Sequence, residues 1–226
     1  MKNKFFNSLF FLIWIIFSLS ASSADEEFTF NISEIEILEN GDKINGTNGG
    51  TAISDDGSTI TGENFFYNKL TNILEITGNV KYLDNINNVI IIADKVIYFK
   101  NDEKIFTIGN SKVVDENKDI KADNLEYDKS RNTFKAKQNA EITDYEKDTK
   151  IYAEEISYLI NAEKIFTKGE TKALIQKKYK FKSSDVSYFR NDENVFSEKK
   201  TSVEDDNGNI YKLDKFSYNI TKELLK

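Results

Sequence analysis

Apolar and polar residues alternate in short stretches of this chain, and these stretches recur about every 30 residues. Six times the sequence shows a small residue, an acid, any residue, an apolar residue, any residue and a tyrosine. The fifth copy has Ser184 in place of the acid, and the sixth begins with Leu213. A steady period of this length predicts one supersecondary unit stacked on itself. The six tyrosines, spaced 29 to 31 residues apart, are Tyr67, Tyr98, Tyr127, Tyr158, Tyr188 and Tyr218.

Each unit is predicted to contain three strands, separated by turns rich in Asn, Asp and Gly. In the second unit the alternation covers residues 80–82, 89–99 and 105–108. Gly78 and Gly109 open successive units, which fits a tight turn or a bulge. A helix is disfavoured, because no window keeps apolar residues at helical spacing for more than about two turns. We therefore predict an elongated all-β fold of about six 30-residue repeats over residues 25–226.

The parity of each strand predicts which side chains are buried. Side chains two residues apart lie on one face of a strand, so the apolar residue two before each tyrosine shares its face. These residues are Phe65, Val96, Leu125, Ile156, Val186 and Phe216. A further apolar residue seven or eight positions after the tyrosine is expected on the same wall, as Leu74, Phe106, Phe134, Phe166 and Phe196. Two outcomes stay open: a solid core, or splayed sheets with a groove for a lipid chain.

Residues 1–24 read as a secretory signal peptide. Lys2 and Lys4 precede a nine-residue apolar run over residues 9–17, and small residues follow at 22–24. The apolar run is too short to span a bilayer comfortably. The sequence therefore predicts an exported protein in which residues 25–226 form one repeat domain.

Composition argues against several classes of function. The net charge is −7, which opposes binding to nucleic acid. Without histidine or cysteine the chain lacks the usual general base and nucleophile pairs, so we predict no enzyme activity and no cofactor. The acids of the repeated pattern, such as Asp94 and Asp123, occur once per repeat without a second ligand at fixed spacing. A role in turns or at strand edges is therefore favoured over a metal site.

The second and third units resemble a known repeat. Gly78 to Tyr82, then Ala93 to Tyr98, then Ile105 to Gly109, are similar to the OstA-like repeat of the lipopolysaccharide transport family. That family includes LptA, the LptC ectodomain and the N-terminal domain of LptD. The resemblance covers roughly residues 28–226.

This resemblance implies a twisted β-jellyroll whose apolar interior carries the acyl chains of lipopolysaccharide in the periplasm, in possible association with the outer membrane. It implies no catalytic residue. Partners would be lipopolysaccharide, other Lpt jellyrolls joined through edge strands, and further copies in a head-to-tail oligomer. The interior positions carried over as lipid-binding are Val80, Val96, Tyr98, Phe106, Leu125, Tyr127, Phe134, Ile156, Tyr158 and Phe166.

Two questions stay open at this point. The chain could be a stand-alone LptA-like protein or an LptD-type fragment without its barrel. A structural or adhesive repeat protein, such as a parallel β-helix with a solid interior, is the competing hypothesis.

Overall fold

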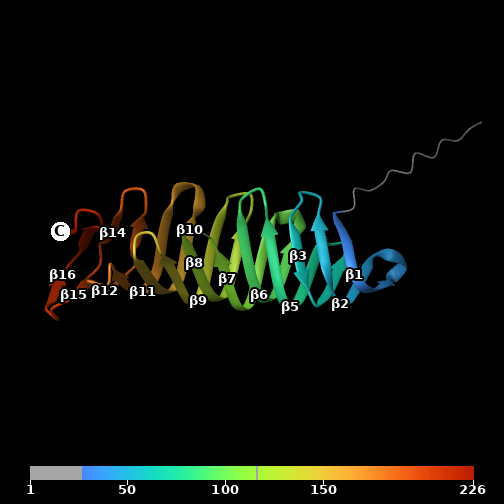
Figure 1. Cartoon of the computed structure of the whole chain (residues 1–226), viewed down its shortest axis with the longest axis horizontal. Helices are drawn as coiled ribbons and strands as arrows, with labels where there is room; N and C mark the ends of the chain where they lie inside the picture. The colour runs from blue at the N-terminus through green and yellow to red at the C-terminus, as the bar shows by residue number, and fades with distance from the viewer. Residues whose placement is uncertain (1–26, 116) are drawn as a thin grey trace, which may run out of the picture.

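The computed structural model describes residues 27–115 and 117–226, so the predicted signal peptide lies outside the described residues. It is an elongated all-β structure that runs from β1 at one end to the C-terminus at the other (Figure 1). Among the described residues, no helix has the length and apolar character needed to cross a membrane. The first nine strands are β1 (Phe28–Leu38), β2 (Lys43–Ser54), β3 (Thr59–Gly62), β4 (Asn64–Asn68), β5 (Ile73–Asp84), β6 (Val89–Phe99), β7 (Lys104–Val114), β8 (Lys118–Asp128) and β9 (Thr133–Asp144).

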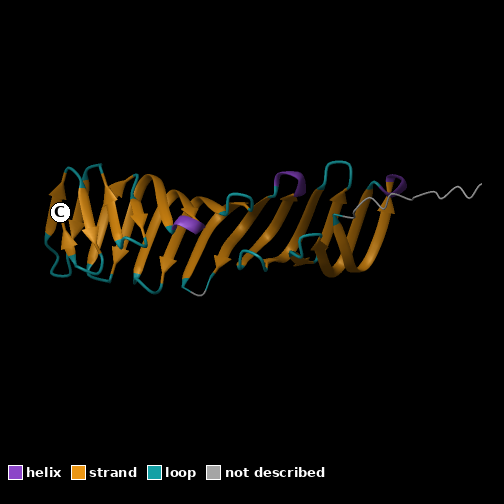
Figure 2. Cartoon of the chain, turned by 90° about the horizontal axis from the view of Figure 1, so that it is seen from above, coloured by secondary structure: helices purple, strands orange, loops and turns teal. Residues whose placement is uncertain are grey.

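The second half of the chain continues the same pattern, and its strands become short only from β12 onward. Three 3₁₀ turns lie in the connections, η1 (Glu39–Gly41), η2 (Lys100–Asp102) and η3 (Ile160–Ala162). The strands run obliquely across the long axis of the molecule (Figure 2). They are β10 (Thr149–Leu159), β11 (Lys164–Ile175), β12 (Tyr179–Ser184), β13 (Ser187–Phe189), β14 (Asn194–Ser197), β15 (Thr201–Glu204), β16 (Ile210–Leu213), β17 (Phe216–Asn219) and β18 (Leu224–Leu225).

All 18 strands belong to one antiparallel sheet, in which the long strands pair in chain order. Strand β5 pairs with β6 from Ile73 opposite Phe99 to Asp84 opposite Val89, so the two form a complete hairpin. The all-β, elongated repeat fold predicted from the sequence is confirmed. The parallel β-helix is wrong, since the described pairings are antiparallel.

The sheet is folded along its length so that its two halves face each other. Tyr82 pairs in the sheet with Ile91, whereas Tyr98 pairs with Leu74 near the other end of the same hairpin. Nevertheless, the rings of Tyr82 and Tyr98 lie 6.3 Å apart, because each strand bends near its middle. One half-sheet carries the repeated tyrosines, and we call it the tyrosine half-sheet. The other carries Tyr82 and Ile91, and we call it the opposite half-sheet.

The bend is built from β-bulges at the middle of the strands. The register of β5 against β6 shifts between Thr77 and Val80, and Gly78 and Asn79 between them have φ of 83° and 47°. The acid of the repeated pattern binds this bulge from the neighbouring strand. Asn79 Nδ2 donates to Glu63 Oε1 at 2.7 Å. The same bond recurs from Asn110 to Asp94 and from Asn139 to Asp123, each at 2.8 Å.

Because of the bulges, the strands divide each unit differently from the three predicted strands. The glycine that opens a unit is a bulge inside a continuous strand, not a boundary between units. The three segments predicted for the second unit are therefore the second half of β5, all of β6 and the first half of β7. One period amounts to two full-length strands, each shared by both half-sheets.

Replacing a bulge glycine should destabilise the fold more than replacing a turn glycine with a similar backbone. A Cβ at Gly109, where φ is 78°, would lie 2.4 Å from Asp94 Oδ2, whereas at Gly208, where φ is 82°, it meets no atom within 4 Å. We expect about 1 kcal/mol of backbone strain in both alanine variants. Gly109→Ala should lose about 1 kcal/mol more, because the displaced Asp94 loses its bond from Asn110. Urea unfolding measures the difference, and equal losses would contradict this account of the bulge.

Candidate functional site: the apolar interior and its charged mouth

The space between the two half-sheets is lined by apolar side chains that lie within a few per cent of complete burial. Most of them are residues that strand parity predicts to be buried. Because the half-sheets face each other, side chains from strands distant in the sheet also meet there, as Phe28 meets Tyr98 with 5.6 Å between ring centroids. Of the ten positions carried over from the resemblance, eight are buried in this interior, namely Val80, Val96, Tyr98, Leu125, Tyr127, Phe134, Ile156 and Tyr158.

The other two positions, Phe106 and Phe166, were predicted to be interior and are not. Both are half-buried on the outer face, and their neighbours Ile105 and Ile165 occupy the interior instead. The hairpin register gives the reason, since Ile105 pairs with Tyr98 and Ile165 with Tyr158. Paired residues share a face, so the interior position is the seventh after the tyrosine. The eighth, which the prediction also accepted, has the opposite parity; Phe196, the eighth after Tyr188, is likewise half-buried while Val195 is buried.

Through the middle of the molecule the interior is closed and filled by the protein's own side chains. Tyr82, Tyr98 and Ile105 have no exposed surface, which an interior open to solvent would not allow. Aromatic rings stack across it, as Tyr127 does on Phe134 with centroids 4.7 Å apart. Of the two outcomes left open by the sequence, the structure shows the closed one.

The interior has two long boundaries of different character. One is the line of bulges, where the sheet is folded. The other, which we call the mouth, lies between two rows of turns. The tyrosine rim comprises the connections that follow β1, β4, β6, β8, β10, β13 and β17, with the strand residues next to them. The opposite rim comprises the connections that follow β2, β5, β7, β9, β11 and β15, with the strand residues next to them.

The repeated tyrosines direct their hydroxyl groups to this mouth. Tyr127 donates to Asp84 of the opposite rim at 3.4 Å, and Tyr188 donates to Asp144 at 3.0 Å. Tyr218 donates to Gln176 at 3.1 Å. Burial raises the pKa of the Tyr127 and Tyr188 phenols, so these hydroxyls keep their protons and act as donors. These three tyrosines therefore each contribute a ring to the interior and a hydrogen bond across the mouth, whereas Tyr67 and Tyr158 donate to Asn72 and Glu163 of their own rim.

Ion pairs join the two rims with a regular spacing in the sequence. Each of five pairs between a lysine and a carboxylate connects residues 45 or 46 positions apart, about one and a half repeats, and we call these lysine pairs rungs. Their N–O distances are 2.5 Å for Lys100–Asp55, 3.5 Å for Lys129–Asp84, 3.4 Å for Lys118–Glu163, 2.8 Å for Lys147–Glu193 and 2.8 Å for Lys178–Glu223.

Further charged contacts reinforce the rungs. Lys129 Nζ also lies 2.5 Å from Asp56 and donates to Ser58 at 2.9 Å. Burial by itself raises the pKa of Asp56, but hydrogen bonds from Lys129 and Ser58 outweigh it and lower the pKa to about 2. Arg190 contacts Asp144 at 2.7 Å and also Glu146. Burial alone would lower the pKa of Arg190, and these carboxylates raise it above its usual value.

Neither the hydrophobic periodicity nor the acids counted once per repeat predict the rungs. The signal was present as opposite charges that recur 45 or 46 positions apart, such as Asp84 with Lys129 and Lys178 with Glu223. Residues that are one and a half repeats apart lie on strands that are not neighbours in the sheet. Only the folding of the sheet makes such residues meet.

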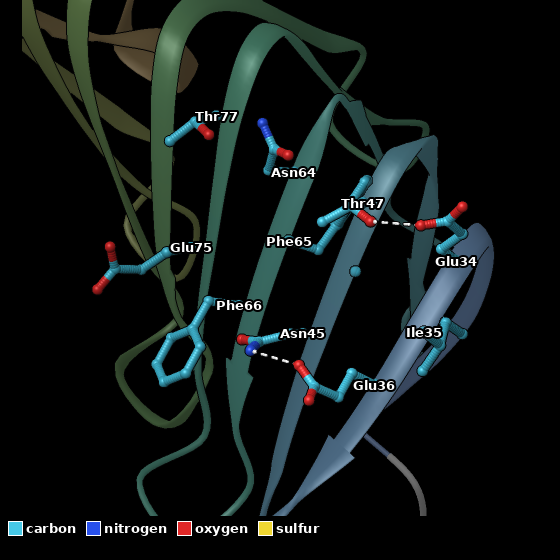
Figure 3. A pocket seen from close by; sticks show the side chains of 11 residues that line it. Glu34, Ile35, Glu36, Asn45, Thr47, Asn64, Phe65, Phe66, Glu75 and Thr77 are labelled. Carbon is cyan, nitrogen blue, oxygen red and sulfur yellow. Dashed lines mark hydrogen bonds between the residues drawn. The ribbon is translucent and has the colours of Figure 1, made fainter.

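The outer surface carries shallow hollows that differ from the interior. One of them, about 510 Å³, lies over β1, β2, β4 and β5. Its wall is mainly polar: Asn45 donates to Glu36 and Thr47 donates to Glu34, while Phe66 supplies an aromatic edge (Figure 3). A smaller hollow of about 320 Å³ is lined by apolar residues that include Phe99 and Phe106. Within the described residues, no group of three or more His, Cys, Asp or Glu is placed to hold a metal ion.

At the end formed by β1, the inner face is not covered. Ile37 pairs with Ile44, which packs against the core, so Ile37 belongs to the inner face. Ile37 is nevertheless 68% exposed, and Ile35 on the same face is 46% exposed. Among the described strands, β1 pairs only with β2, so its other edge is free. The apolar interior therefore reaches the surface at this end.

Comparison with known proteins supports the resemblance read from the repeats. Residues 59–164, a little under half of the chain, match the family model "LptA/(LptD N-terminal domain) LPS transport protein". The resemblance to this family is thereby confirmed over those residues. No match is found among the curated proteins.

Two solved structures are similar at low identity. LptH from Pseudomonas aeruginosa, "the LptA homologous periplasmic component of the conserved lipopolysaccharide transport device", is 14% identical with a TM-score of 0.45, over 49% of this chain and 82% of LptH. The TCP10 domain of Danio rerio CPAP, in complex with a peptide of Danio rerio STIL, is 11% identical with a TM-score of 0.18. That match covers 81% of this chain and 97% of the domain.

Truncation of an interior phenylalanine should lower the free energy of unfolding more than truncation of an outward-facing one, which tests how the two faces of the tyrosine half-sheet are assigned. Phe134→Ala removes a ring that is 3% exposed and stacked on Tyr127, and should lower the free energy of unfolding by about 3–5 kcal/mol. Phe106→Ala removes a half-buried ring from the outer face and should cost about 1 kcal/mol. Chemical unfolding of the two variants provides the measurement. A larger loss for Phe106→Ala would mean that the faces are assigned the wrong way round.

The stabilising contribution of Asp56 should depend on pH. Its pKa is lowered from 3.8 to about 2 in the folded protein, so folding favours the ionised form. The contribution is complete above about pH 4 and is lost as the pH falls through about 2; it amounts to about 2 kcal/mol. The unfolding free energies of the wild type and Asp56→Asn should therefore converge between these pH values. Asp102→Asn, at an exposed position, is the control, and an unchanging difference for Asp56→Asn would refute the assignment.

Proposed function

We propose that this chain, which over residues 59–164 resembles the LptA and LptD N-terminal family, is a non-enzymatic carrier of lipopolysaccharide. The observation that carries the proposal is the continuous apolar interior between the half-sheets. It extends from Phe28 in β1 to Tyr218 in β17 as one cluster of buried residues. Such a lengthwise interior suits acyl chains better than it suits a compact polar substrate.

The acyl chains would occupy the space now filled by the side chains of the two half-sheets. The proposed contacts are the eight interior positions, such as Val96 and Leu125, together with Ile105 and Ile165 in place of Phe106 and Phe166. Because the interior is closed, lipid has to separate the rims while the bulges act as the hinge. Burial of each methylene contributes about 0.8 kcal/mol, so an acyl chain of a dozen carbons offers about 10 kcal/mol toward this opening.

We further propose that the chain acts in series with other jellyroll domains of the same family, or with further copies of itself. The free edge of β1 and the exposed inner-face residues Ile35 and Ile37 support this assembly. A strand from another domain would extend the sheet and cover these residues at the same time. The interiors of the two domains would then be continuous.

The predicted signal peptide over residues 1–24 supports action in the periplasm, where such a carrier could lead to the outer membrane. Both an LptA-like protein and the N-terminal part of an LptD-like protein are compatible with this role. A purely structural repeat protein is the alternative, in which the interior would serve only as core.

Photo-crosslinking tests the proposal directly. A photoreactive phenylalanine analogue at Tyr127 or Phe134 lies in the interior, whereas the same analogue at Glu126 lies on the outer face of the same strand. We expect lipopolysaccharide to be captured by the two interior positions and not by position 126. The matched outward position controls for contact with the lipid surface or with micelles. Capture confined to position 126 would contradict the carrier function and favour the structural alternative.

A further inference from the structure

The rungs across the mouth differ strongly in burial along the molecule. The lysine side chains of the first two rungs, Lys100 and Lys129, are 9% and 7% exposed, and Lys118 of the third is 7% exposed. Exposure rises to 22% for Lys147 and to 44% for Lys178. The carboxylate partner of Lys178, Glu223, is also half exposed at 47%. The closure of the mouth is therefore not uniform.

Burial decides how firmly each rung holds. Breaking one partner away from a buried ion pair leaves an uncompensated charge in a poorly solvated place, which is strongly unfavourable. Lys129 illustrates this, since it contacts Asp56, Asp84 and Ser58 and lies about 6 Å from the ring centroids of Tyr82 and Tyr98. An exposed pair such as Lys178–Glu223 is rehydrated when it opens and costs little to break.

We propose that the Lys178–Glu223 rung is the lateral portal through which acyl chains reach the interior, whereas the rungs of Lys100, Lys118 and Lys129 are permanent clasps. This inference rests on the proposed carrier function and adds a place of access to it. Chains entering between the rims at this rung would meet the interior directly, without passing from the β1 end.

The residues around this rung fit a portal. Besides the ion pair, the rims are joined here by Gln176, which accepts a bond from Tyr218 at 3.1 Å and donates one to the Ile220 carbonyl at 3.3 Å. These bonds are neutral and can be replaced by water. Aromatic rings that an apolar chain could contact lie on the interior side of this rung. The ring centroids of Tyr179 and Tyr218 are 5.2 Å apart, and that of Phe181 lies 5.7 Å from that of Tyr218.

The first experiment removes the charges of the rung without removing its bulk. The variant Lys178→Gln with Glu223→Gln should speed uptake of dansyl-labelled undecanoic acid by about two- to fivefold, the range that an exposed ion pair supports. The matched control is Lys180→Gln with Glu204→Gln. That pair is similarly exposed, with an N–O distance of 2.7 Å, but joins the neighbouring strands β12 and β15 and does not cross the mouth. Equal rates for the two double variants would overturn the proposal.

The second experiment closes the rung covalently. The chain contains no cysteine, so Lys178→Cys with Glu223→Cys can be joined specifically by a short bis-maleimide. Uptake of the same fatty acid should fall at least severalfold after crosslinking. The matched control, Lys180→Cys with Glu204→Cys, should keep its uptake rate when it is crosslinked in the same way. Unchanged uptake through the closed rung would show that chains enter elsewhere and would overturn the proposal.

Hydrogen exchange of the lipid-free protein separates this inference from the proposed function. Absence of uptake in every variant would contradict the carrier function. Even in that case, an easily opened Lys178–Glu223 rung predicts that the backbone amides of residues 176–178 and 218–223 exchange faster than those of residues 84–87 and 127–129. It also predicts that Lys178→Gln with Glu223→Gln accelerates the first group more than the control variant does. Equal protection of both groups would overturn the portal whether or not lipid binds.

Discussion

The bulge at the middle of alternate long strands, β2, β5, β7, β9 and β11, is the constraint on which the rest of this structure depends. A hairpin of two 11- or 12-residue strands without a bend would be one flat, two-sided surface with its apolar face in water. Because Gly78 and Asn79, and their equivalents in later strands, place the bend at the same level, each long strand contributes to both half-sheets. The two apolar faces then cover each other, and the acid of the repeated pattern fixes the bulges of β5, β7 and β9 by binding an asparagine there.

The same bend creates two boundaries with different physical properties. At the bulges the backbone is continuous, so the half-sheets cannot separate there. At the mouth they are held only by side chains, through the hydroxyls of tyrosines such as Tyr127 and through ion pairs such as Lys129–Asp84. For Tyr127, Tyr158 and Tyr188 the ring belongs to the interior, and the hydroxyl donates to a carboxylate at the boundary with water.

An interior filled by the protein's own side chains is compatible with a role in carrying lipid if the free energy needed to separate the rims is smaller than the free energy released when the lipid is buried. The covalent hinge keeps the strands in register while the mouth opens, so only interactions between side chains are exchanged. Apolar contacts between Tyr, Ile and Val can be replaced by contacts with methylenes at little net cost, since both are nonspecific. The charged rungs are the part that lipid cannot replace. Their uneven burial therefore decides where the opening is cheapest.

The sequence by itself determined the repeat, the all-β class and the interior placement of Val96, Leu125 and Phe134, because strand parity depends only on local alternation. It could not separate the seventh from the eighth residue after each tyrosine, so Phe106 and Phe166 were placed on the wrong face. That choice depends on hairpin register, which is a property of two strands. It also could not show that a unit glycine bends a strand, or that Lys178 meets Glu223. Contacts one and a half repeats apart exist only after the sheet folds over itself, and so the tertiary structure alone decided that the interior is closed and what closes it.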